Sequence, residues 1–288
     1  MAWKGIGSVL LASVLAIAVG GASAGNARGV RKAVESSMLV TGSVTIRPDV
    51  TVQSHEIDPK IELTPHIRSL VEGAARRWTF EPVKVDGRIV TARVPMSLRL
   101  IAKPAKQEGR YDVSIDSVRF GWVEPAKGGL ASIRKLVPPS YPKSALQMGG
   151  KGTVYLLVRV DDAGRVIDAE VEQVNLRVVG SSHQMESLRN AFGQACVRAV
   201  RKWTFTPPTA GPDALAASWV GRVPIDFTLS GDRRAEPGQW ETYVRGPRNT
   251  DIPWARAQLR TAGSPDALPE GGVYPLGHGA HLLNQDAG

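Results

Sequence analysis

A short motif, Trp-Thr-Phe-x-Pro, occurs twice in this chain, beginning at Trp78 and again at Trp203. Before each tryptophan, apolar residues recur at steps that place them on one stripe of an α-helix. These residues are Ile67, Leu70, Val71, Ala74 and Ala75 before Trp78, and Phe192, Ala195, Cys196, Ala199 and Val200 before Trp203. An internal repeat constrains the fold strongly, because it predicts two copies of one supersecondary unit.

Strand patterns flank both predicted helices. After the motif, apolar and polar residues alternate over 93–100 and over 222–229, as in half-buried strands. Before the second helix, alternating runs over 154–160 and 167–172 surround a turn that ends at Gly164. In the second of these runs we expect one face inward and the acidic face in solvent; the inward residues are Ile167, Ala169 and Val171, and the outward ones are Asp168, Glu170 and Glu172.

Shorter runs at 42–46 and 50–52 are the equivalents in the first copy. The predicted fold class is therefore α+β, with two small ββαβ units, each a three-stranded antiparallel sheet covered by one helix. The first unit spans 38–102 and the second 137–230. The connecting segment 103–136 contains a predicted hairpin, with strands at 111–115 and 118–122.

The two ends of the chain differ from this body. Residues 1–24 have a positive start at Lys4, an apolar run and small residues before Gly25, which predicts a cleaved export signal and a periplasmic protein. The alternative is an uncleaved inner-membrane anchor. Residues 231–288 are rich in glycine and proline, and we expect this tail to be disordered.

Composition excludes several classes. The 42% hydrophobic and 22% charged residues are those of an ordinary globular chain, and the single cysteine, Cys196, excludes a disulfide framework. Cys196 lies on the apolar helix stripe, where a small buried hydrophobe is expected. The net charge of +9 is spread rather than clustered. In an exported protein such charge favours anionic cell-wall polymer over nucleic acid.

No catalytic or cofactor motif is present in the sequence. It lacks a phosphate-binding loop, a Gly-x-Ser-x-Gly elbow and a zinc-protease motif. His278 and His281 are three positions apart, but no third metal ligand accompanies them. We therefore expect a protein that is not an enzyme and that has no cofactor or metal.

The second unit resembles the C-terminal domain of the TonB family of periplasmic energy transducers. The resemblance rests on motifs in the family's order, of which the key positions are Tyr141, Pro142, Gly152, Gly164, Trp203, Phe205 and Pro207. The first unit keeps the helix, the Trp-Thr-Phe-x-Pro motif and the last strand. It lacks the Tyr-Pro pair and the Asp-Gly turn, so it looks like a degenerate second copy.

The resemblance implies a binding mode. In this family the last strand of the sheet leaves an open edge, to which an extended segment of an outer-membrane transporter adds as another strand. Self-pairing into dimers uses similar edges. Pro224 supports an edge position, because proline cannot donate to a sheet ladder. The residues expected at this edge are Val220, Arg222, Pro224, Asp226 and Thr228, with the polar side chains turned outward.

The predicted function is that of a non-enzymatic periplasmic protein. It would bind an outer-membrane transporter, or another periplasmic protein, by β-strand addition in energy-coupled transport. The alternative is a peptidoglycan-binding module with no transport role, which the positive charge favours. The same strand residues could also be ordinary solvated positions.

Overall fold

The computed structural model describes residues 8–10, 34–85, 87–105, 107, 109–121, 131–207, 216–233, 235–276 and 279–284. Of the predicted export signal at 1–24, the structure describes only β1 (Ser8–Leu10). The rest of this segment, with the expected cleavage site before Gly25, lies outside the described residues. His278 also lies outside them. Within the described part of the chain, no helix combines the length and the apolar character needed to cross a bilayer.

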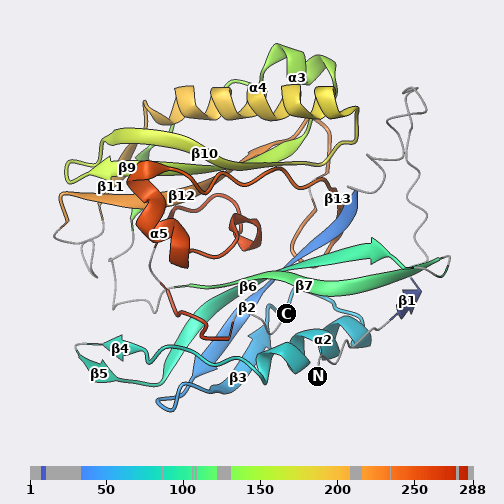
Figure 1. The fold of residues 1–288 in the computed structure, drawn as a ribbon, viewed down its shortest axis with the longest axis vertical. Helices are drawn as coiled ribbons and strands as arrows, with labels where there is room; N and C mark the ends of the chain where they lie inside the picture. Colours follow the sequence, from blue (N-terminus) through green and yellow to red (C-terminus); the bar gives the residue numbers. More distant parts are fainter. Residues whose placement is uncertain are drawn as a thin grey trace.

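The first sheet is built around β2, a long central strand (Figure 1). It pairs antiparallel with β6 on one side, and on the other side with β13 and β3 in succession. β7 pairs with the far side of β6, and β1 pairs with β7. The bounds are β2 (Glu35–Ile46), β3 (Val52–Ile57), α2 (Pro65–Ala75), β6 (Ala92–Pro104), β7 (Arg110–Phe120) and β13 (Trp240–Tyr243). A small hairpin consists of β4 (Lys84–Val85) and β5 (Arg88–Ile89).

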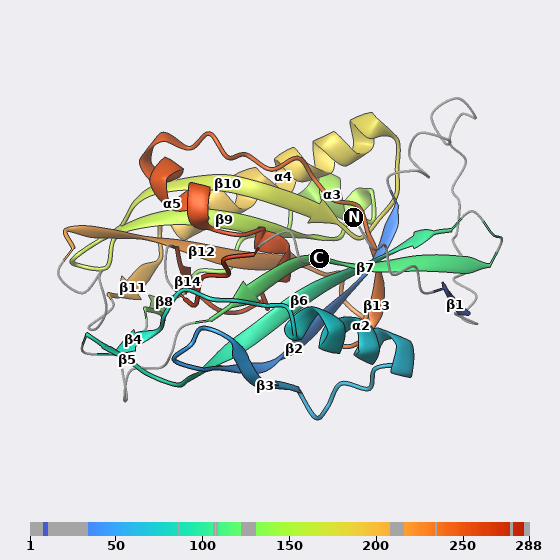
Figure 2. The same ribbon diagram turned by 60° about the horizontal axis from the view of Figure 1, so that its bottom comes forward.

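The second sheet has the order β10-β9-β12-β14, and helix α4 lies across one of its faces (Figures 1 and 2). α4 begins with a capping box, in which Ser181 and Gln184 exchange side-chain and backbone hydrogen bonds. The bounds are α3 (Lys143–Gln147), β9 (Gly152–Asp161), β10 (Val166–Leu176), α4 (Ser182–Val200), β12 (Ser218–Phe227) and β14 (Tyr274–Pro275). A separate pair of strands is formed by β8 (Ser132–Lys135) and β11 (Thr204–Thr206).

The two sheets share a local arrangement of elements. In the first, β3, β2 and β6 are neighbours and α2 lies between β3 and β6 in the chain; in the second, β10, β9 and β12 are neighbours and α4 occupies the same place. The residue after each helix-closing tryptophan makes a similar contact. Thr79 bridges to Thr51 at the start of β3, and Thr204 bridges to Arg165 at the start of β10.

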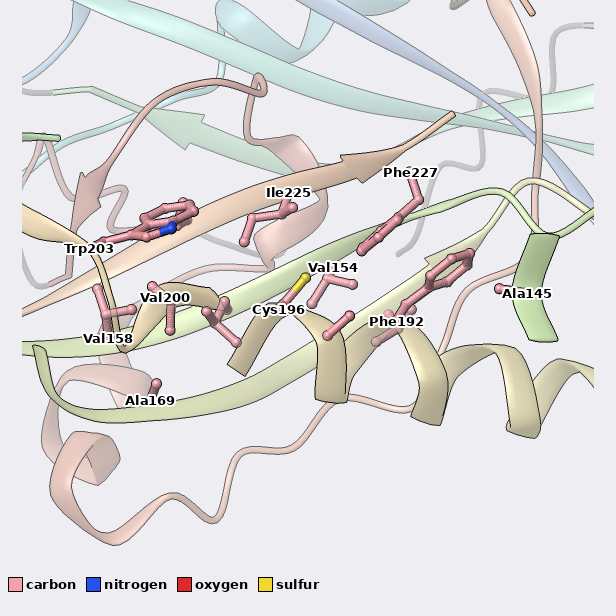
Figure 3. Packing of buried hydrophobic residues seen from close by; sticks show 14 of the residues in the cluster. Ala145, Val154, Val158, Ala169, Phe192, Cys196, Val200, Trp203, Ile225 and Phe227 are labelled. Carbon is pink, nitrogen blue, oxygen red and sulfur yellow. The ribbon is translucent and has the colours of Figure 1, made fainter. Parts of the chain in front are cut away.

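Each sheet has its own apolar core. In the second core, α4 side chains pack against one face of the sheet, and Phe192 stacks on Phe227 with ring centroids 4.3 Å apart (Figure 3). Cys196 points from α4 toward the sheet and is 0% exposed. Burial raises the pKa of its thiol, as expected for a core hydrophobe. In the first core, Trp78 and Phe80 both pack edge-on against Phe120 of β7.

The expectation of a disordered tail at 231–288 is wrong for its described residues. β13 pairs with β2, the segment after it bonds to β10 through Val244 and Asn249, and β14 pairs with β12. Two short 3₁₀ helices, η1 (Pro253–Ala255) and η2 (Pro265–Ala267), and helix α5 (Arg256–Thr261) lie between these contacts. Composition misleads here, because scattered apolar residues are buried against the sheets and the neighbouring strands satisfy the tail's backbone groups.

The predicted hairpin in 103–136 is also wrong, since β7 is one continuous strand. The register with β6 shifts between Ser117 and Ile115, which leaves Asp116 as an extra residue. The site expected to be a turn is therefore a β-bulge. As a consequence, β7 pairs with β6 along the outer edge from Met96 to Pro104.

β10 contains two further bulges that overturn part of the expected side-chain pattern. Its register with β9 shifts next to Ile167 and again next to Glu172. Each shift exchanges the two faces of the strand. Ile167 is consequently 49% exposed and Glu172 is 1% exposed, the reverse of their predicted positions.

The turn between β9 and β10 requires a glycine at position 164, and this requirement can be tested by substitution. Gly164 has a φ of 81°, and a Cβ built there would lie 2.0 Å from the carbonyl oxygen of Phe205. We expect Gly164→Ala to lower the free energy of unfolding by about 3 kcal/mol in urea denaturation, because strain and a clash with backbone add together. The control is Gly109→Ala. Gly109 has a φ of 76° with nothing within 4 Å, so only about 1 kcal/mol is expected. Equal losses would contradict the clash.

Candidate functional site: the edge of strand β12

The outer edge of β12 is defined by which backbone groups point away from β9. The amide of Leu276 donates to the carbonyl of Val220 at 2.9 Å. Backbone groups of a strand alternate in direction, so those of Val220, Arg222 and Pro224 point to this outer edge. Pro224 faces Tyr155 of β9, and its missing N–H lies on the outer side, so the β9 ladder loses no bond there.

The outer edge is closed by this chain's own tail, which corrects the expectation of an open edge. β14 pairs antiparallel with β12 at Gly221 and Arg222. The contact extends to Val220, whose carbonyl accepts the hydrogen bond from the Leu276 amide. The sequence could not reveal this, because 46 residues of glycine- and proline-rich chain, 228–273, separate β12 from the covering strand β14.

Arg222 does not point into solvent as predicted. It is 2% exposed and forms a two-bond ion pair with Glu172, at 2.6 and 2.7 Å. Burial lowers the pKa of Arg222, and the Glu172 carboxylate partly restores it. Arg248 from the tail donates to the same carboxylate at 2.8 Å. The ion pairs of Glu172 with Arg222 and Arg248 therefore hold the tail on the sheet, and the tail in turn covers Arg222 and Glu172.

The other predicted edge residues lie at two separate places. Val220 belongs to a small apolar cluster with Leu157 and the tail residues Ile252, Ala255, Leu259 and Leu276. Asp226 forms an ion pair with Arg177 at 2.6 Å and accepts a hydrogen bond from the hydroxyl of Thr228. The structure thus brings Asp226 and Thr228 together at the end of β12 and separates them from Val220 and Arg222.

The motif residues that carry the family resemblance build the fold. The Tyr141 hydroxyl donates to the Gly150 carbonyl, and its ring packs edge-on against Phe192 and Phe227. Trp203 donates through its indole N–H to the Val137 carbonyl at 2.7 Å. The remaining positions act through the backbone or the core: Pro142 precedes α3, Gly152 and Gly164 approach backbone carbonyls closely, Phe205 is 0% exposed, and Pro207 follows β11.

The sequence analysis missed a polar cluster centred on Asp266 of the tail, which is 0% exposed. Its carboxylate accepts hydrogen bonds from Asn175 at 2.6 Å, Gln173 at 2.9 Å and Tyr243 at 2.5 Å. Its backbone carbonyl accepts from Arg99 of β6 at 2.9 Å. The cluster links both sheets to the tail. The one available signal was that Gln173 and Asn175 alternate with Val174 and Leu176 at the end of the strand.

Two buried tyrosines beside this cluster predict alkaline sensitivity. Burial raises the pKa of Tyr155 to about 12, and burial followed by the charge of Asp266 raises the pKa of Tyr243 further. In the unfolded chain both phenols titrate near pH ~10. Above that pH the unfolded state loses protons first. The contribution of these two tyrosines to the free energy of unfolding is therefore fully present below about pH 10 and falls as pH rises toward 12.

The measurement is a tyrosinate absorbance titration recorded together with circular dichroism. We expect absorbance from these two phenols only as the ellipticity collapses. Tyr243→Phe should flatten the alkaline fall in stability. Formation of tyrosinate at all five tyrosines near pH 10 in a folded chain would contradict the expectation.

Strand β12, the covering helix α4 and the motif-built core all lie within one segment of the chain, and that segment matches a known family. Residues 137–229 match the family model described as Gram-negative bacterial TonB protein C-terminal. This confirms the resemblance inferred from the motifs. The chain is α+β with antiparallel sheets and few helices, consistent with a TonB C-terminal fold.

The relatives that match over this domain include two TonB proteins from different organisms. Protein tonB2 of Pseudomonas aeruginosa is 38% identical over 92 residues, which make up 32% of this chain and 29% of that protein. Protein TonB of Xanthomonas campestris pv. campestris is 33% identical over 99 residues, 34% of this chain and 38% of that protein. The matched region therefore spans well under half of each relative. No solved structure matches the chain.

No metal site accompanies this edge. Within the described residues, no group of three or more His, Cys, Asp or Glu side chains lies close enough to hold an ion. The chemistry that the site offers is main-chain hydrogen bonding along β12, beside the apolar side chains of Val220 and Val223 and the buried pair of Arg222 with Glu172.

Proposed function

We propose that this chain is a periplasmic, TonB-like binding protein of energy-coupled transport. It would take up an extended segment of an outer-membrane transporter, or of another periplasmic protein, as a strand beside β12. Proteins of the TonB family are energy transducers rather than enzymes, which supports a binding role without catalysis.

One observation carries the proposal. The neighbour of β12 on its outer side, β14, comes from outside the matched domain 137–229 and pairs over only two residues. The domain's own strands end at β12 on that side. β12 therefore takes an extended segment that is foreign to the domain, which is the physical act of strand addition performed within one chain.

The test is a titration of the ¹⁵N-labelled chain with synthetic peptides from the periplasmic N-terminal segments of TonB-dependent transporters. We expect the amide signals of Arg222 and Asp226 to shift, because their N–H groups point to the outer edge. The signals of Val223 and Ile225, whose amides face β9, should move less. Shifts confined to loops, or no shifts at all, would remove the proposal.

A second candidate function is binding to peptidoglycan, favoured by the net charge of +9. Co-sedimentation with isolated peptidoglycan distinguishes it. Electrostatic binding falls steeply between low and moderate salt, whereas strand addition depends only weakly on salt. Absence of sedimentation at low salt would eliminate this alternative.

We also propose that residues 38–102 are a degenerate second copy of the domain. The matching strand neighbours and the equivalent bridges of Thr79 and Thr204 support it. The two copies differ in what lies on their outer edge. β7 covers β6 through paired residues from Met96 to Pro104, so the first copy offers no edge there for a partner.

A further inference from the structure

We propose that the tail segment 273–276, Val-Tyr-Pro-Leu, is an exchangeable internal ligand of β12, and that partner segments bind with the same side-chain pattern. At four successive positions, that pattern has a β-branched or other aliphatic residue, then an aromatic residue, then any residue, and then a second aliphatic residue. The inference rests on the proposed function and specifies the chemical class of its partner.

The pattern follows from the alternation of β14. Val273 is packed against the core that α4 covers, and it lies next to Gly221, where a built Cβ would be 3.2 Å from Val273 Cγ1. Leu276, on the opposite face, is 6% exposed and packs with Leu157 and Val220. The edge of β12 therefore offers one apolar contact site on each face of the sheet. These two sites accept side chains that are three residues apart along the added strand.

The aromatic position has a partner from the first sheet. The guanidinium carbon of Arg119, on β7, lies 4.6 Å from the centroid of the Tyr274 ring. A cation at this distance from an aromatic face stabilises the contact, and more so when it is partly desolvated. Arg119 thus selects an aromatic residue at this position of any strand that is added to β12.

The segment is held by few contacts compared with the permanent strands. β14 pairs over two residues, whereas β7 pairs with β6 over nine positions. The approach to β14 passes through Gly271, with a φ of 78°, and Gly272. A backbone hydrogen bond contributes only about 1 kcal/mol net, so release of this segment costs far less than release of β7.

The retained tail raises the apparent dissociation constant of any partner. A segment tethered to its own site acts at a high effective concentration, on the order of millimolar. The affinity measured for a partner in solution is reduced by the fraction of molecules in which the edge is vacant. Weakening the tail contact should therefore tighten partner binding.

The experiment uses the full chain and a peptide probe with the sequence of residues 270–277, Glu-Gly-Gly-Val-Tyr-Pro-Leu-Gly. Leu276→Ala weakens the internal segment, and Leu283→Ala is the matched control, since Leu283 is 59% exposed in the same tail. By fluorescence anisotropy we expect Leu276→Ala to bind the probe about tenfold or more tightly than wild type. Leu283→Ala should bind as wild type does.

A locked variant tests the site independently of stability. Val220→Cys together with Leu276→Cys places two thiols on facing residues of β12 and the tail, where a disulfide can form. Cys196 is fully buried and does not compete. Oxidation should abolish probe binding and reduction should restore it. A probe with alanine at the tyrosine position should bind about tenfold more weakly to Leu276→Ala.

Equal probe affinity for wild type, Leu276→Ala and the oxidised lock would overturn the inference, as would failure of Leu276→Ala, folded by circular dichroism, to bind the probe. The proposed function fails separately. If the tail peptide exchanges but transporter peptides bind neither wild type nor Leu276→Ala, the internal ligand stands and the transport partner does not.

Discussion

Glu172→Ala should lower the free energy of unfolding by about 3–5 kcal/mol, measured by urea denaturation. The carboxylate of Glu172 is 1% exposed and is the counter-ion of Arg222, which is 2% exposed. Removing it leaves a buried guanidinium without compensation, the costly way to break a buried ion pair. Arg248, also bonded to Glu172, is 27% exposed at its side chain and can turn toward solvent.

Removal of the other partner of this ion pair, Arg222, should lower the free energy of unfolding by less. Arg222→Met leaves Glu172 still paired with Arg248, so we expect a loss of about 1–2 kcal/mol. Glu172→Leu combined with Arg222→Met should be more stable than Glu172→Ala, because the pair is replaced by apolar groups. The control is Glu170→Ala, an exposed glutamate on the same strand, with a change within about 0.5 kcal/mol. Equal losses for Glu170 and Glu172 would contradict the buried pair.

Asp266→Ala should cost a similar amount, about 3–5 kcal/mol, and should also free the tail. Three buried donors, from Gln173, Asn175 and Tyr243, lose their common acceptor. Each unsatisfied buried group costs about 1–3 kcal/mol. Because this cluster links the tail to both sheets, we expect limited proteolysis to cut the tail of Asp266→Ala well before that of the wild-type chain.

Asp251→Ala provides the matched control. Asp251 lies in the same tail and pairs with Arg256, but its side chain is 82% exposed, so its loss should change stability by less than about 1 kcal/mol. A double-mutant cycle of Asp266→Ala with Tyr243→Phe should show strong coupling, since the two side chains share a bond. An additive cycle would show that Asp266 acts elsewhere.

The second unit was largely predictable because its signals are local. Helical spacing before Trp203, alternation along β12 and the turn at Gly164 each depend on residues close in sequence. The family match then confirmed the motif order over 137–229. Bulges were not predictable in the same way. The shifts at Ile167, Glu172 and Asp116 depend on the partner strand, which no local pattern contains.

The strand proposed as the candidate site forms as predicted, but its outer edge pairs with the tail and is not open. Pro224 correctly indicated an outer edge, yet alternation alone placed Arg222 in solvent. Whether the outward face of a strand meets water or another layer depends on what packs against it. Here the tail and the first sheet cover that face, and composition gave no sign that a glycine- and proline-rich segment would do so.

The sequence by itself therefore determined the helix, strands and turn of the segment 137–229, their order, and the family that this segment resembles. It could do so because periodicity and turn chemistry act over a few residues. Only the tertiary structure decided that β14 pairs with the outer edge of β12, that Glu172 and Arg222 are buried, and that Asp266 joins the tail to both sheets. These are contacts between residues far apart in the chain, and their partners are chosen by three-dimensional packing and by the need to satisfy every buried polar group.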